Sequence, residues 1–170
     1  MEGEIVNRVA NSKLISFDLE EYYSDSERVI LDVKEWLFMD MIIKEKDFRE
    51  KVKSHNWSMY QNKSVAIICS ADAIVPTWAY MLLVINLEPV VNMVVLGDLE
   101  TLEIALFSKA LSKVDVAKYQ DAKIVVKGCS KLPVPEYAYT EITRLLRPHA
   151  SSIMYGEPCS TVPLYKARKI

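Results

Sequence analysis

The stretch VPTWAYMLL, at residues 75–83, decides the fold, because a variant of it, VPEYAYTEI, returns at residues 134–142. Val, Pro, Ala and Tyr recur in place, and Trp78 is answered by Tyr137, all at one constant offset along the chain. Self-similarity at a fixed offset indicates that one structural unit occurs twice. The chain therefore has the pattern of an internal duplication.

The similarity extends outward on both sides of this stretch. VAIICS at 65–70 corresponds to VVKGCS at 125–130, with the offset longer by a single position. Residues 57–98 and 116–157 are thus predicted to be two copies of one supersecondary unit. The outer matches are Tyr60-Gln61-Asn62 with Tyr119-Gln120-Asp121, and Gly97-Asp98 with Gly156-Glu157.

Each copy has the pattern of a βαβ unit. It opens with a β-branched apolar run, which is typical of a strand buried on both faces. Pro76 or Pro135 then suits the first helical position, and Pro89 or Pro148 follows the end of the helix. A second apolar strand ends in glycine. Two such units predict an α/β fold with a doubly wound, mostly parallel sheet in the strand order 2-1-3-4.

Length and composition predict a single domain over residues 1–170. The chain is 51% hydrophobic and 26% charged, so it has enough apolar residues to form one sizeable core. ISFDLEEYY and RVILDV, near the N-terminus, look like additional strands that lengthen the sheet or form a flanking layer. The predicted parts are N-terminal flanking strands and helices (1–56), the first repeat (57–98), a connecting helix (99–115), the second repeat (116–157) and a C-terminal tail (158–170).

The charge pattern and the absence of targeting signals exclude several classes. A net charge of −2 gives no field for nucleic acid or an anionic membrane, although the final YKARKI is basic. No apolar run approaches the ~18 residues that a membrane span needs, and the N-terminus lacks a signal-peptide pattern, so a cytoplasmic location is predicted. No nucleotide-binding motif is present. The sequence leaves oligomer formation open.

The three cysteines are the strongest candidates for chemistry. Cys69 and Cys129 end the first and third predicted strands, and Cys159 follows the fourth. In one parallel sheet these strand ends share an edge, where ligands bind in open α/β folds. Thiolates at adjacent strand ends can reach one ion, so we predict that the three cysteines bind an iron–sulfur cluster or zinc.

Residues around the cysteines fit the same hypothesis. A serine follows each cysteine, and its hydroxyl or amide can hydrogen-bond to the sulfur. Glycines at strand ends allow sharp turns or a close approach to a cofactor, and nearby carboxylates can supply a fourth ligand. The predicted cofactor-binding residues are Ser70, Ser130, Ser160, Gly128, Gly156 and Glu157.

Two other interpretations stay open. In the first, the protein is a thiol enzyme in which Cys69 is the nucleophile, activated by a helix N-terminus with Asp72 nearby; no histidine base is evident. In the second, the protein is a non-catalytic interaction scaffold. Its cysteines are then small core residues, as a free cysteine at the end of a core strand usually is.

Several segments resemble an uncharacterised bacterial family of unknown function. They are KEKDFREKVKSHNW, CSADAIVPTWAYML, VVKGCS, EITRLLRP and YGEPCSTVPLYK, and the resemblance extends over the whole chain. The resemblance implies no established activity. It suggests an association with iron–sulfur assembly genes, which makes iron–sulfur assembly proteins the expected partners.

Overall fold

A computed structural model describes residues 14–128 and 131–168, and the chain forms two compact units. The continuous unit is Ser24–Leu106. The split unit combines the chain up to Tyr23 with the chain from Phe107 onward. Each unit is described by itself.

The continuous unit is built on a three-stranded parallel sheet in the order β2-β3-β4. The strands are β2 (Arg28–Asp32), β3 (Ser64–Ile68) and β4 (Met93–Leu96). Strand β3 lies in the middle and is buried from Ser64 to Ile67, which explains its unalternating apolar sequence SVAII. The two edge strands are less buried.

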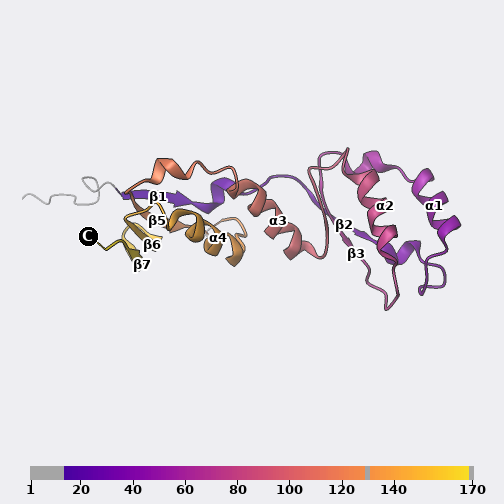
Figure 1. The fold of residues 1–170 in the computed structure, drawn as a ribbon. Coiled ribbons are helices and arrows are strands. Elements are labelled where there is room, and N and C mark those ends of the chain that lie inside the picture. Colours follow the sequence, from indigo (N-terminus) through magenta and orange to yellow (C-terminus); the bar gives the residue numbers. More distant parts are fainter. Residues whose placement is uncertain (1–13, 129–130, 169–170) are drawn as a thin grey trace, which may run out of the picture. The chain divides into compact units, whose positions relative to one another are not determined.

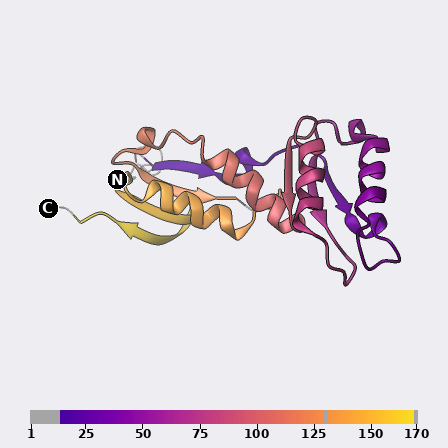
Figure 2. The same cartoon turned by 45° about the vertical axis from the view of Figure 1, so that its right-hand side comes forward.

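Helices cover both faces of this sheet. Helices α1 (Glu45–Ser54) and α2 (Thr77–Leu87) lie side by side and share one core with the sheet (Figures 1 and 2). On the other face, Leu102 and Leu106 of α3 (Leu99–Leu111) pack against Ala66. The larger core contains Leu31, Val33, Phe48, Val52, Tyr60, Val65, Ile67, Ala79, Leu83 and Leu87.

The split unit has a four-stranded sheet in the order β1-β5-β6-β7. Its first three strands are parallel, and β7 turns back antiparallel to β6. Helix α4 (Glu136–Leu146) packs on one face through Ala138, Ile142 and Leu146. The strands are β1 (Leu14–Asp18), β5 (Lys123–Lys127), β6 (Ser152–Glu157) and β7 (Ser160–Lys166).

The two units repeat one another element by element at the offset seen in the sequence. Strand β3 corresponds to β5, helix α2 to α4, and strand β4 to the start of β6. The 3-10 helices η3 (Trp57–Tyr60) and η4 (Val116–Tyr119) keep the same offset. Asn62 and Asp121, also matched, both have positive φ, of 60° and 57°. The predicted duplication therefore exists in three dimensions.

Each unit also contains its own copy of the N-terminal strand. ISFDLEEY begins with β1, and the similar VILDVKEW begins with β2. Asp18 and Asp32 end these strands and cap the 3-10 helices η1 (Leu19–Tyr22) and η2 (Val33–Trp36), accepting from the backbone two residues on. Both strands pair parallel with the first strand of a repeat, β1 with β5 and β2 with β3.

The structure confirms the α/β class with parallel βαβ units and flanking helices. The order 2-1-3-4 within one sheet is not confirmed, because the two repeats lie in separate sheets. The reason is that β1 pairs with β5 of the second repeat and β2 pairs with β3 of the first repeat. Each repeat thus gains its own edge strand, and two sheets form instead of one longer sheet. No helix among the described residues is both long and apolar enough to cross a bilayer.

Candidate functional site

The carboxyl edge of the three-stranded sheet is organised by Asp32. Its Oδ1 accepts hydrogen bonds from the amides of Lys34 (2.9 Å) and Ser70 (3.0 Å), and its Oδ2 accepts from the Ser70 hydroxyl at 2.5 Å. Asp32 at the end of β2 thus fastens the loop that follows β3. Ser70, predicted to serve a cofactor, is used here to hold the loop.

Two ionisable side chains at this edge have shifted pKa values. Burial alone would raise the pKa of Asp32, but the hydrogen bonds from Ser70 and the Lys34 amide lower it below its ordinary value. Burial raises the pKa of the Tyr80 hydroxyl, and the neighbouring Cys69 and Asp32 raise it further. The edge therefore favours an ionised carboxylate beside a neutral phenol.

Cys69 is half-buried and packs against the apolar core of the continuous unit. Its Sγ donates to the carbonyl of Ala71 at 3.6 Å. At the offset that relates the two helices its counterpart is Gly128, so Cys69 and Cys129 are not equivalent positions. Cys69 thus occupies the place of a small core residue.

The carboxyl edge of the four-stranded sheet has different chemistry. Lys127 at the end of β5 forms an ion pair with Asp18 at the end of β1, with Nζ 2.8 Å from Oδ2. The Asp18 carboxylate raises the pKa of Lys127 by hydrogen bonding and by its charge. A Cβ at Gly128 would lie 2.8 Å from the Tyr139 hydroxyl and 3.2 Å from Leu19 Cβ, so glycine permits this close packing.

The predicted metal centre is wrong. The described residues contain no group of three or more His, Cys, Asp or Glu side chains that could hold a metal ion. Cys69 follows β3 of the continuous unit, whereas Cys159 lies in the turn between β6 and β7 of the split unit. Cys129 lies outside the described residues. The prediction failed because strand ends share an edge only when the strands share a sheet.

The other predicted site residues are placed as follows. Asp72 is exposed in the loop between β3 and α2, and its proposed role beside Cys69 stays a prediction. Gly156, Glu157 and Ser160 belong to the β6–β7 hairpin, where Gly156 has φ of 117° and a Cβ would lie 2.6 Å from the Ser160 carbonyl oxygen. These residues shape a hairpin. Ser130 lies outside the described residues.

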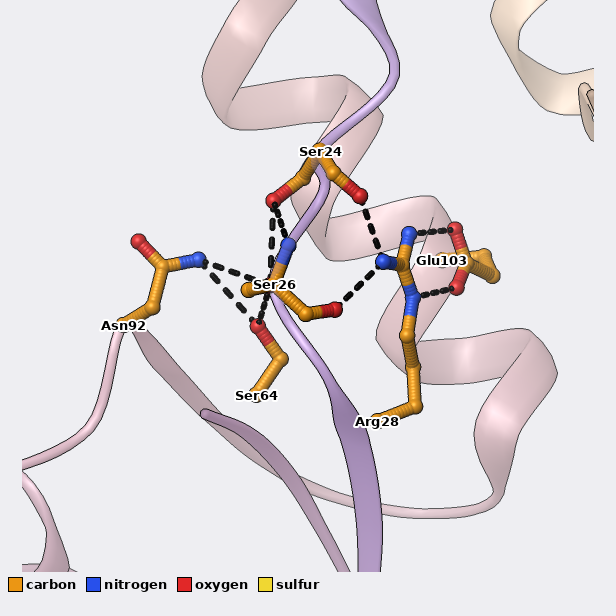
Figure 3. Close-up of polar contacts among 6 residues, drawn as sticks. All are labelled: Ser24, Ser26, Arg28, Ser64, Asn92 and Glu103. Atoms are coloured by element: carbon orange, nitrogen blue, oxygen red, sulfur yellow. Dashed lines mark hydrogen bonds and ion pairs between the residues drawn. The ribbon is translucent and has the colours of Figure 1, made fainter. Parts of the chain in front are cut away.

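The amino ends of the strands carry polar groups that sequence reasoning passed over. In the continuous unit, Arg28 at the start of β2 forms a forked ion pair with Glu103 of α3, with nitrogen to oxygen distances of 2.5 and 3.0 Å (Figure 3). Its remaining nitrogen donates to the carbonyls of Ser24 and Ser26. The two charged side chains are only 16% and 19% exposed, so water screens the pair weakly.

A second set of hydrogen bonds closes the same end of the sheet. The buried hydroxyl of Ser64 lies 2.6 Å from that of Ser26, and the Asn92 amide donates to both, at 3.1 and 3.3 Å (Figure 3). These residues precede or begin the three strands. Together with Arg28 and Glu103 they form a closed polar network.

The corresponding end of the split unit is open and basic. A hollow of about 660 Å³ lies there, which is within the usual size of small-molecule sites. We call it the basic hollow, because three of its side chains are cationic and one is anionic. Its lining residues are Asp121, Lys123, Ser151, Ser152, Lys166, Ala167 and Arg168.

The register of the sheet places the cations of the basic hollow. Lys123 of β5 is paired with Ser152 of β6, and Ser152 is paired with Lys166 of β7. Neighbouring strands are ~4.8 Å apart, so the backbones of the two lysines are about 10 Å apart, with Ser152 between them. Residues in register project from the same face of a sheet. The row Lys–Ser–Lys therefore presents two ammonium groups and a hydroxyl together.

The structure around the basic hollow, as far as it is described, shows no ion-pair partner for its cations. Lys123, Lys166 and Arg168 are exposed, and in the described part of the chain none of them forms an ion pair. Ser151 donates its hydroxyl to the Ala122 carbonyl at 3.0 Å, which fixes one wall. The signal in the sequence was the basic YKARKI segment, but Lys123 joins it only through strand pairing.

These features define a duplicated α/β protein with two parallel βαβ units, of which one has a closed polar network and the other an open basic hollow at the same end of its sheet. The chain belongs to the family described as "Protein of unknown function (DUF2480)", whose model matches residues 3–167. This match confirms the resemblance at the level of a family of unknown function. No curated protein and no solved structure matches the chain.

Proposed function

We propose that the protein binds a small anionic ligand, carrying phosphate or carboxylate groups, in the basic hollow of the split unit. The observation that carries the proposal is the row Lys123, Ser152 and Lys166, joined by Arg168, around a hollow of about 660 Å³. Ammonium and guanidinium groups bind such oxyanions by charge-assisted hydrogen bonds. The net charge of the whole chain is −2, so this concentration of cations is local.

The duplication supports this proposal through an internal comparison. In the continuous unit Ser64 and Met93 stand at the positions of Lys123 and Ser152, and its sheet has no strand that corresponds to β7. The cation of that row, Arg28, matches Leu14 and is already neutralised by Glu103. The split unit has more cations at this end, and among its described residues no helix carboxylate forms an ion pair with them. Asp121 is the single acidic residue of the lining, and it leaves the basic hollow with an excess of positive charge.

Binding of this kind needs no metal and no thiol chemistry. The metal-binding function predicted from the cysteines is replaced by one that rests on lysine and arginine. The ligand class follows from charge and size: the hollow suits a small molecule with one or two oxyanion groups. The cytoplasmic location predicted from the sequence remains part of the proposal.

Titration calorimetry with pyrophosphate, inorganic phosphate and citrate, on the full chain at low ionic strength, tests the proposal. We expect pyrophosphate to bind, and the double variant K123Q/K166Q to lower its affinity by about 10-fold or more, because two cations are removed while uncharged polar side chains remain in their place. Higher salt should weaken binding as screening increases.

The matched control is K46Q/K131Q, which removes the same total charge from exposed lysines outside the basic hollow. It should bind pyrophosphate like the parent protein. Equal losses in the two double variants would mean that only net charge matters, and would reject the site. Absence of binding by the parent protein to pyrophosphate, phosphate and citrate would reject the function itself.

A further inference from the structure

The walls of the basic hollow are joined to one another by backbone hydrogen bonds. The Asp121 amide donates to the His149 carbonyl at 2.9 Å. The Ser151 amide donates to the Ala122 carbonyl, and the Ser151 carbonyl accepts from the Ala167 amide, both at 2.8 Å. The lining side chains therefore stand on a fixed framework, as a specific binding site requires.

One carboxylate, that of Asp121, stands among the cations of this hollow. The backbone does not require it, because Asn62 holds the matched position in the continuous unit with φ of 60°, against 57° for Asp121. The Asn62 amide also makes the matched hydrogen bond, to the Val90 carbonyl at 2.8 Å. Since asparagine serves the same turn, the negative charge at position 121 is not a requirement of the fold.

A carboxylate beside cations restricts the chemistry of the ligand that fits there. The Asp121 carboxylate accepts hydrogen bonds and donates none, so it disfavours an oxyanion at its own position and favours a hydroxyl or an amine of the ligand. An ammonium group would be repelled by Lys123, Lys166 and Arg168, whereas a neutral hydroxyl would not. The Ser152 hydroxyl, between the two lysines, can both donate to and accept from further hydroxyls.

The composition of the lining favours a sugar over a nucleobase. Among the described residues the lining contains no aromatic side chain, and Ala167 is its single apolar residue. Proteins commonly hold a nucleobase by stacking it on an aromatic ring. A volume of about 660 Å³ has room for a sugar with its phosphate.

We propose that the ligand of the basic hollow is a sugar or other polyol that carries a phosphate group, and that Asp121 selects it by its hydroxyls. This inference rests on the proposed anion-binding function and adds the chemical class of the ligand. The cations of the hollow bind the phosphate oxygens. Asp121 accepts hydrogen bonds from the neighbouring hydroxyls, as an acidic residue does from the ribose of a bound dinucleotide.

Titration calorimetry on the full chain with glycerol-3-phosphate and propyl phosphate tests the proposal, because these probes share phosphate and carbon chain and differ only in their hydroxyls. We expect glycerol-3-phosphate, and also glucose-6-phosphate, to bind about 5-fold or more tighter than propyl phosphate. Asp121→Asn should remove most of this preference, because a neutral acceptor binds hydroxyls more weakly than a carboxylate. The same variant should keep or raise the affinity for pyrophosphate, because it removes a negative charge from the hollow.

The control is Asp40→Asn, which removes the same charge from another exposed aspartate of positive φ, 56°, in the continuous unit. It should bind every probe like the parent protein. If pyrophosphate binds but neither hydroxylated probe binds tighter than propyl phosphate, this inference is overturned and the proposed function stands. A preference for hydroxyls that persists in Asp121→Asn, or an equal weakening of every probe in that variant, also overturns it. A parent protein that binds none of the probes overturns both.

Discussion

The two units of this protein share one backbone plan but differ at the amino ends of their sheets. In the continuous unit Arg28 forms an ion pair with Glu103, and the hydroxyls of Ser26 and Ser64 form a hydrogen bond with each other. In the split unit Lys123 and Lys166 face a hollow of about 660 Å³. The same fold thus uses polar residues for stability in one copy and exposes them in the other. After a duplication, the polar residues of one copy can stabilise its fold while the matched end of the other copy acquires a different surface.

The largest effect is expected from opening the closed polar network. Arg28→Met leaves the half-buried Glu103 carboxylate without its forked partner and should lower the free energy of unfolding of the continuous unit by about 2–4 kcal/mol. Urea titration followed by tryptophan fluorescence reports on this unit alone, since Trp36, Trp57 and Trp78 all lie within it.

Two further variants sharpen that measurement. Lys63→Met breaks a more exposed ion pair with Glu27 and should cost about 0–1 kcal/mol. The double variant R28M/E103M should recover much of the loss, because replacing both charges with apolar groups leaves neither of them unpaired. If Arg28→Met costs no more than Lys63→Met, the network is not what stabilises this end of the sheet.

An intermediate effect is expected at the carboxyl edges, where Asp32 and Asp18 occupy matched positions. Asp32→Ala should cost about 1–2 kcal/mol, because the cap of η2 and both bonds to Ser70 are lost together. Asp32→Asn should keep most of the stability, since its amide oxygen still accepts. Urea unfolding of the two variants checks this; equal losses would show that the carboxylate charge, and not the cap, carries the effect.

Asp32 also makes the continuous unit sensitive to acid. Its folded-state pKa lies below the unfolded value, so its contribution is complete above the unfolded pKa and is lost as pH falls through the folded pKa. The unfolding midpoint should therefore drop less steeply below pH 4 in Asp32→Asn than in the parent protein. Parallel acid slopes in the two proteins would contradict the shift.

The smallest effect on stability is expected from the titration of His55. The split unit has no corresponding effect, because Val114 occupies the matched position. Burial lowers the pKa of His55, whose ring packs against Trp36 and Trp57. The unfolded state then binds more protons below its own pKa of about 6.5, so stability falls as pH drops through that value. Phe in place of His55 should remove this slope, measured by tryptophan fluorescence between pH 5 and 8.

Local patterns were sufficient to predict the repeated units. The apolar runs, the prolines before α2 and α4, and the constant offset between matched residues are contained within the two copies, so they indicate βαβ units without knowledge of the rest. The partner of each outer strand depends on pairing across the chain. The similarity of ISFDLEEY to VILDVKEW would have assigned one such strand to each repeat.

The candidate site was less predictable, because its residues meet only through the sheets. The cysteine hypothesis assumed one shared edge, and it failed once Cys69 and Cys159 were found in different units. Lys123 and Lys166 are far apart in the sequence and come together through β6, which pairs with both of their strands. The positions of charged residues in the sequence do not predict that these two lysines lie close together, because their alignment depends on the register of the β6–β7 hairpin.

The order of strand pairing has a consequence for how the chain folds during synthesis. Strand β2 pairs with β3 by closing the chain from Arg28 to Ser64, whereas β1 pairs with β5 by closing a loop about three times as long, from Leu14 to Lys123. The continuous unit is nested within the longer closure, so all of its residues emerge from the ribosome before β5 does. The continuous unit can therefore fold first, which shortens the loop that closes when β1 pairs with β5. Without this shortening, the extra length of the loop would cost about 1 kcal/mol of chain entropy. Until then β1 lacks β5, its strand partner in the described structure, and its backbone hydrogen-bonding groups stay unpaired in the nascent protein.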